Sequence, residues 1–186
     1  MRTRLNIASS IFAVAVLALA GAVFVAPGAR AANGTSADVS PMSRQVQQNL
    51  AGLPWYGVFD NLSYQVNGSE VVLTGQVISE HSQTKRDAEN AVKRVEGVTK
   101  VVNNIEVLPP LPFDNRIRQD EYRAIFSQSN LGRYSMGAIP QIHIIVNGGH
   151  VTLEGTVMNE MDRNIAQLTA NSVPGVFSVT NNLRIG

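Results

Sequence analysis

The sequence predicts an α+β protein built from two tandem copies of one small α-β-β-α-β module, each a three-stranded mixed sheet with its helices on one face. Two repeats predict this. Residues 66–80 (VNGSEVVLTGQVISE) return as residues 146–160 (VNGGHVTLEGTVMNE), with eight of 15 positions identical. Residues 95–107 return as residues 173–185, with six of 13 positions identical. Unrelated sequences match at only about one position in fifteen, so the chain is a tandem repeat.

The first 31 residues have the pattern of a secretory signal peptide. Arg2 and Arg4 precede an apolar run at residues 11–26, and residues 29–31 (Ala-Arg-Ala) form an A-x-A cleavage site. The apolar run is shorter than the 20 or so residues that a membrane-spanning helix needs. We therefore expect cleavage before Ala32, export to the periplasm and no transmembrane span in the mature chain. The alternative is an uncleaved N-terminal anchor.

Composition excludes several classes of protein. The chain has no cysteine, so it forms no disulfides, binds no metal through thiolate and carries no N-terminal lipid on cysteine. Without residues 1–31 it has 12 basic and 14 acidic residues, a formal charge of −2. No basic stretch of the kind that coats DNA remains, so we predict no nucleic-acid partner. No cofactor is predicted.

The first helix of each module follows a short polar or proline-rich segment. Residues 32–41 form a polar, flexible leader. After it, apolar residues at helical spacing predict the first helix of module 1. These residues are Met42, Val46, Leu50 and Leu53. In module 2 we expect the matching helix at residues 114–126, with Asp114 as its N-cap.

A β-hairpin follows the first helix. Alternating apolar segments surround Asn67-Gly68, two residues that both tolerate positive φ, and this pattern predicts a turn at those positions. Gly75 and its counterpart Gly155 lie on the face that must be buried. A glycine inside a strand marks the close approach of another backbone, which we expect to be the helix lying across the sheet.

A second helix and a third strand complete each module. An apolar stripe predicts a helix at residues 80–95, and a third strand follows at residues 98–107. Gly97 and Gly175 are predicted to end the second helices in the left-handed conformation. The module boundaries that follow are 42–108 for module 1, a stiff Pro-rich linker at 109–112, and 113–186 for module 2.

Two strands around Asn-Gly, a strand glycine, a helix and then V-x-G-V-x-x-V-x-N-x-[ILV]-x-[VI] resemble the BON domain. The match rests on Gly75, Val95, Gly97, Val98, Val101, Asn103 and Ile105, and again on Gly155, Val173, Gly175, Val176, Val179, Asn181 and Leu183. Tandem BON domains behind a signal peptide are similar to osmotically inducible periplasmic proteins. The resemblance implies no catalysis. It implies a role in binding anionic phospholipid or other envelope proteins, or a stress-related chaperone-like function. Without a lipid-bearing cysteine or a LysM module, membrane tethering and peptidoglycan binding are not implied.

Asn103 and Asn181 occupy the same place in the two repeats. They could contact a ligand, or each amide could tie the backbone of the turn at the strand end. We favour the structural role, because a shared fold explains the repetition equally well.

The sequence predicts no enzyme. The three histidines are His81, His143 and His150, and the repeat places His143 opposite Glu154 on the face away from the core. One histidine and one glutamate are too few ligands for zinc. No nucleophile elbow, phosphate-binding loop or dinucleotide-binding motif is present.

The strongest candidate binding patch lies at the front of module 2. Its residues are Arg116, Arg118, Tyr122, Arg123 and Arg133. Arginine interleaved with tyrosine suits the head-group layer of an anionic membrane. A solvated helix face is the alternative, since nearby acids reduce the local charge to +1. Residues 53–59 (LPWYGVF) form a second aromatic cluster, which could pack in the core, form a seam between modules or bind a partner.

These observations predict a non-catalytic, exported, non-lipidated interaction protein of the cell envelope that binds envelope proteins or membrane components. One alternative is a peripheral binder of anionic phospholipid. Another is a periplasmic, stress-related chaperone-like protein.

Overall fold

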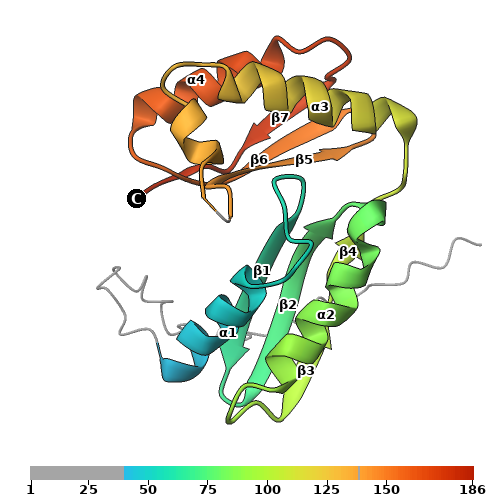
Figure 1. Ribbon diagram of the computed structural model, residues 1–186, viewed down its shortest axis with the longest axis vertical. Coiled ribbons are helices and arrows are strands. Elements are labelled where there is room, and N and C mark those ends of the chain that lie inside the picture. Colours follow the sequence, from blue (N-terminus) through green and yellow to red (C-terminus); the bar gives the residue numbers. More distant parts are fainter. Residues whose placement is uncertain (1–39, 138) are drawn as a thin grey trace, which may run out of the picture. The chain divides into compact units, whose positions relative to one another are not determined.

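The computed structural model describes residues 40–137 and 139–186 (Figure 1). The predicted signal peptide at residues 1–31 lies outside the described residues, as does the leader up to residue 39. In the described part of the chain, no helix combines the length and apolar character needed to cross a membrane.

Module 1 has the predicted order of elements. They are α1 (Pro41–Ala51), β1 (Asn61–Asn67), β2 (Glu70–Val77), the 3-10 turn η1 (Ser79–His81), α2 (Ser82–Lys93), β3 (Lys100–Asn103) and β4 (Glu106–Val107). β1 pairs antiparallel with β2, whereas β3 and β4 both run parallel to β2. The predicted third strand is therefore one strand position interrupted in its middle.

Module 2 repeats this arrangement. Its elements are α3 (Pro112–Phe126), the 3-10 turn η2 (Gly132–Ser135), β5 (Ile142–Asn147), β6 (His150–Val157), α4 (Glu160–Asn171), β7 (Ser178–Asn181) and β8 (Arg184–Ile185). β5 pairs antiparallel with β6, and β7 and β8 run parallel to it. In each module the two helices cover one face of the mixed sheet (Figure 1). The predicted α+β class and the tandem modules are confirmed.

Each module has its own apolar core between its helices and its sheet. In module 1 this core includes Val46 and Leu50 of α1, Val71 and Leu73 of β2, and Val92 of α2. The helix α1 begins where the side chain of Ser40 accepts a hydrogen bond from the Ser43 amide (3.1 Å), which satisfies one of the unpaired donors at the helix start. Helical spacing and the cap together fix the face that α1 buries.

Asp114 does not cap α3, contrary to the prediction. The helix begins at Pro112, whose fixed φ suits the first helical position, and Leu111 is the N-cap. The carboxylate of Asp114 is buried and accepts hydrogen bonds from the amides of Gly148 and Gly149, at 2.8 and 2.9 Å. It therefore holds the β5–β6 turn against α3.

The first hairpin turn is centred one residue later than predicted. Asn67 pairs with Glu70, so Gly68 and Ser69 form the turn, and Gly68 has φ +64° while Asn67 stays in the ordinary region. The glycine takes the positive φ because it has no Cβ to clash.

Gly75 marks a close backbone approach, but the neighbour is a strand rather than the predicted helix. Its φ is +120°, and an added Cβ would lie 2.0 Å from the carbonyl oxygen of Asn61 in β1. Gly155 has the same relation to Gln141. Gly97 and Gly175 have positive φ as predicted, at +85° and +91°, yet α2 and α4 end a few residues before them, so both glycines lie in the turns that follow.

Candidate binding site between the modules

The segment between α1 and β1 packs on module 2. Val58 and Phe59 pack against the core cluster of module 2. The carbonyl oxygen of Val58 accepts a hydrogen bond from the Ile144 amide at 2.8 Å. Of the roles considered for residues 53–59, the structure therefore shows a seam between the modules.

Val58 binds β5 at its outer edge. In the β5–β6 hairpin the even-numbered residues of β5 direct their amides and carbonyls away from β6, as the Ile144 bond shows. The guanidinium of Arg118 donates to the next outward carbonyl, that of Val146, at 2.7 Å. An edge strand offers unpaired amides and carbonyls to any other chain. On β5, two residues of the same chain, Val58 and Arg118, bond to these groups.

His143 is covered by the same segment. It lies opposite Glu154, as the repeat predicted, but it is only 6% exposed and so is not the exposed residue that we expected. The ring of Tyr56 stacks on it with centroids 5.2 Å apart, and its Nδ1 lies 3.2 Å from the carbonyl oxygen of Gly57. Burial lowers the pKa of His143, because the charged form loses its hydration.

Asp60 shapes the segment, and sequence reasoning missed it. Its buried carboxylate accepts hydrogen bonds from the amides of Gly57 (3.0 Å) and Ile78 (2.9 Å) and lies 2.6 Å from Nδ1 of His81. These bonds join the turn before β1 to the end of β2. No periodic pattern marks an aspartate of this kind, since its partners are distant amides.

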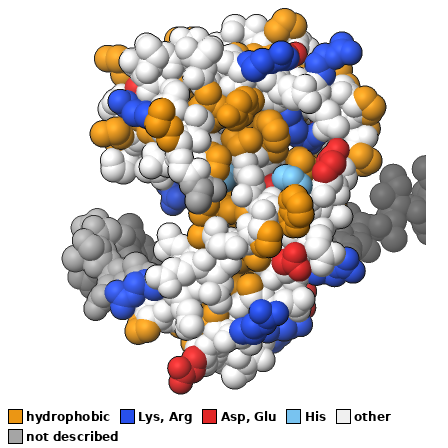
Figure 2. Space-filling view, in the orientation of Figure 1, with side chains coloured by type: hydrophobic (Ala, Val, Ile, Leu, Met, Phe, Trp, Pro, Cys, Tyr) orange, Lys and Arg blue, Asp and Glu red, His pale blue; other side chains and the backbone are white. Residues whose placement is uncertain are grey.

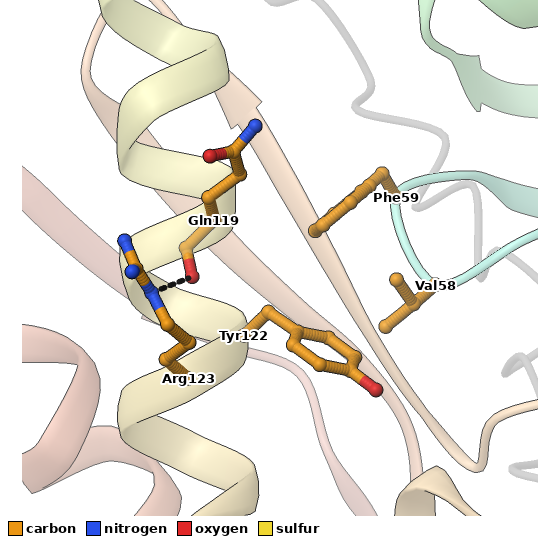
Figure 3. Close-up of a pocket in the computed structure, with 5 residues that line it drawn as sticks. All are labelled: Val58, Phe59, Gln119, Tyr122 and Arg123. Atoms are coloured by element: carbon orange, nitrogen blue, oxygen red, sulfur yellow. Dashed lines mark hydrogen bonds between the residues drawn. The ribbon is translucent and has the colours of Figure 1, made fainter.

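A pocket of about 330 Å³ opens where this segment meets α3 (Figure 3). It is lined by Val58, Phe59, Gln119, Tyr122 and Arg123. The rings of Phe59 and Tyr122 meet edge to face with centroids 6.3 Å apart. The guanidinium of Arg123 lies at the rim, where it donates to the Gln119 carbonyl (3.3 Å) and pairs with the carboxylate of Asp120. Both modules contribute walls, so the pocket requires the seam.

A second pocket of about 410 Å³ lies beside the first and shares Phe59 and Gln119 with it. Its lining includes Ile78, His81 and Arg118. Figure 2 shows hydrophobic side chains gathered over the middle of this face, beside a histidine. We call the two pockets together the seam groove. Its walls are largely apolar and include the guanidinium groups of Arg118 and Arg123 together with the carboxylate of Glu80, so the groove suits an apolar group that carries polar or charged substituents.

The structure separates the five predicted patch residues. Arg116, Tyr122 and Arg123 are exposed on α3. Arg118 is only 2% exposed and serves the β5 edge. Arg133 lies away from α3 on η2, where its hydrogen bonds to Tyr134 and Asp162 raise its pKa.

Asn103 and Asn181 have the structural contacts expected of them. The amide nitrogen of Asn103 donates to the carbonyl of Lys85 in α2 (2.8 Å), and its oxygen accepts from the Ile105 amide (3.2 Å). Asn181 repeats both bonds with Arg163 and Leu183. Each asparagine therefore bridges the gap that interrupts the third strand.

The chain thus holds two copies of one β-hairpin, helix and interrupted strand, each with its bridging asparagine. The BON domain family matches residues 39–109 and 128–186. This chain belongs to the BON domain family. BON domains are non-catalytic binding modules, and no catalytic family matches. The α3 wall of the pocket lies entirely between the two BON matches, at residues 112–126.

No curated protein matches this BON chain. Among solved structures it is similar to the C-terminal domain of CdsD, a structural protein of the type III secretion system of Chlamydia trachomatis. The identity is 12%, with 78% of this chain and 98% of that chain covered and a TM-score of 0.30. A second CdsD structure shares 12% identity, with 77% and 92% covered and a TM-score of 0.28. Overlap at this level supports no functional argument.

Proposed function

We propose that this BON protein is an exported, non-catalytic interaction protein of the cell envelope that binds a partner through the seam groove. The observation that carries the proposal is the pocket itself: apolar side chains of one BON module and α3 of the other form it together. Tyr122 is 40% exposed there, and Phe59 is half-buried. Aromatic residues that remain accessible at a concave site favour binding of an apolar group.

A photo-crosslinking experiment in cells tests this proposal. A photoreactive phenylalanine analogue at the exposed position Gln119 should crosslink to a specific envelope protein or lipid. The product should disappear when Tyr122→Ala removes one pocket wall. The same analogue at Phe177, an exposed aromatic outside the groove, is the control. Equal products from both positions, or a product that survives Tyr122→Ala, would contradict a role for the groove.

Anionic phospholipid is the second candidate for the bound partner. Arg116 and Arg123 lie on the exposed side of α3 together with Phe113, which is 46% exposed, and Tyr122. This combination suits the head-group layer of a membrane. Such an attraction would be weaker than the sequence suggested, because Arg118 is buried, Arg133 pairs with Asp162 and Arg123 pairs with Asp120.

A chaperone-like role is supported by a different surface. Met161 and Leu168 lie exposed on α4, and Met158, just before the helix, is exposed as well. Flexible methionine side chains suit binding of varied apolar segments. Suppression of aggregation of an unfolded exported protein, lost in Met161→Lys but not in Tyr122→Ala, would favour this role over the seam groove.

A further inference from the structure

The two BON modules carry the same edge strand in different states. The offset of 80 residues makes Tyr64 the counterpart of Ile144 and Val66 the counterpart of Val146. On β5, the outward amide of Ile144 bonds to Val58, and the outward carbonyl of Val146 bonds to Arg118. On β1, no residue in the ranges 40–137 and 139–186 bonds to the main chain of Tyr64 or Val66. The first outward amide of β1, that of Leu62, lies 3.4 Å from the hydroxyl of Tyr56.

A groove of about 490 Å³ runs along this second edge. Its lining includes Leu50 and Ala51 of α1, Leu62 and Tyr64 of β1, and Ile139 of module 2. Arg184 stands at the groove, and no described carboxylate lies within ion-pairing distance of its guanidinium. The groove thus combines apolar side chains, main-chain groups of β1 that no described residue pairs, and one positive charge.

We propose that β1 binds an extended segment of a partner protein as an added strand. Outward amides and carbonyls of β1 would pair with the main chain of the segment, as Ile144 already pairs with Val58. Alternate side chains of an added strand point to one face, so an apolar residue would face Leu50 and Leu62. The guanidinium of Arg184 favours a segment with a carboxylate that lies beside it.

The occupant is another protein rather than a second copy of this chain. In this chain the segment that bonds such an edge, through the carbonyl of Val58, is already engaged with β5 and the core of its own module 2. The groove is continuous with the seam, because Tyr56 lines the groove and also stacks on His143. The inference does not depend on the seam groove. The two grooves are lined by different residues, although residues 53–59 contribute Tyr56 to one and Val58 and Phe59 to the other.

The probe is a synthetic peptide with the sequence of residues 54–60 (PWYGVFD), because Val58 of this segment makes a main-chain hydrogen bond to the equivalent edge of β5 and Asp60 supplies a carboxylate. Hydrogen exchange of the mature protein is followed by NMR with and without the peptide. At a free peptide concentration ten times the Kd, exchange of the Tyr64 and Val66 amides should slow about tenfold. Protection at Ile144 instead would show that the peptide only displaces the chain's own segment, and would overturn the inference.

Tyr64→Pro removes the central outward N–H and spares the β1–β2 ladder, whose bonds come from Ser63 and Gln65. It should weaken peptide binding at least about tenfold, whereas the matched Tyr64→Phe keeps the N–H and should bind. Arg184→Glu, at an exposed residue, tests the charge without altering β1, and decides the matter if Tyr64→Pro does not fold. Equal binding by wild type, Tyr64→Pro and Arg184→Glu would overturn the inference. Tyr122→Ala should leave peptide binding unchanged, which separates this site from the seam groove.

Discussion

The ring of Tyr56 in the first BON module stacks on the imidazole of His143 in the second, with centroids 5.2 Å apart. This contact excludes water from a histidine that would otherwise lie on the open face of β5. With Val58 on the edge of the same strand, it makes one short segment responsible for the seam.

Replacing Tyr56 should change how His143 titrates. Burial holds the pKa of His143 below its ordinary value, so the wild type loses stability as the pH falls through about 6.5, where the unfolded histidine takes up a proton. Tyr56→Ala uncovers the ring, and the pKa of His143 should rise toward 6.5. An NMR titration of the imidazole protons measures this. Tyr56→Phe keeps the cover and is the control; an unchanged titration in Tyr56→Ala would show that other groups bury His143.

Glu121 should make the protein less stable as the pH rises. Its side chain is fully buried in α3 with both oxygens lacking a partner among the described residues, and burial raises its pKa to about 8. The repulsion of Asp120 adds to the effect. The folded state therefore holds this proton more tightly than the unfolded chain, whose glutamate titrates near 4.3. Stability is greatest below that value and falls between about pH 4.5 and 8, by up to about 1.4 kcal/mol per pH unit.

Glu121→Gln cannot ionise, so its free energy of unfolding should lack this loss. Urea unfolding at pH 5 and at pH 8 measures the difference. From pH 5 to pH 8, the free energy of unfolding of the variant should rise relative to that of the wild type by about 2–4 kcal/mol. The same difference between variant and wild type at both pH values would show that Glu121 reaches solvent.

Gly75→Ala should be far more destabilising than Gly68→Ala. Both glycines have positive φ, so both substitutions incur backbone strain of about 1 kcal/mol or more. At Gly68 an added Cβ meets nothing within 4 Å, whereas at Gly75 it would lie 2.0 Å from the Asn61 carbonyl oxygen. Gly75→Ala must therefore push β1 away from β2. Thermal melts of the two variants, compared with wild type, measure the contrast; equal losses would contradict the close approach.

Binding to anionic vesicles, where it occurs, should depend on Arg116 and Arg123. Each exposed arginine near a charged surface contributes about 1 kcal/mol, and salt screens the attraction. Arg116→Glu with Arg123→Glu should abolish co-sedimentation with anionic vesicles at low salt. Arg86→Glu, at an exposed site on α2 of the other module, should not. Arg118 is unsuitable for this test, because its loss would free the edge of β5.

The sequence by itself determined the tandem BON modules, their α-β-β-α-β order and the register of the second hairpin. Helical stripes, strand alternation and a repeat with an offset of 80 are local or periodic signals, which read directly from spacing. The positive φ of Gly97 and Gly175 was predictable for the same reason, since glycine tolerates a conformation that other residues avoid.

Only the tertiary structure decided which side chains reach solvent. Arg116 and Arg118 lie two positions apart on one helix, yet the first is exposed and the second is buried against β5. The same holds for His143, which strand alternation placed on an open face and Tyr56 covers. Burial of such residues depends on contacts between segments that are far apart in the sequence, within module 2 for Arg118 and between the modules for His143. Spacing within one element cannot encode those contacts, and for that reason the seam groove and the open edge of β1 became visible only in three dimensions.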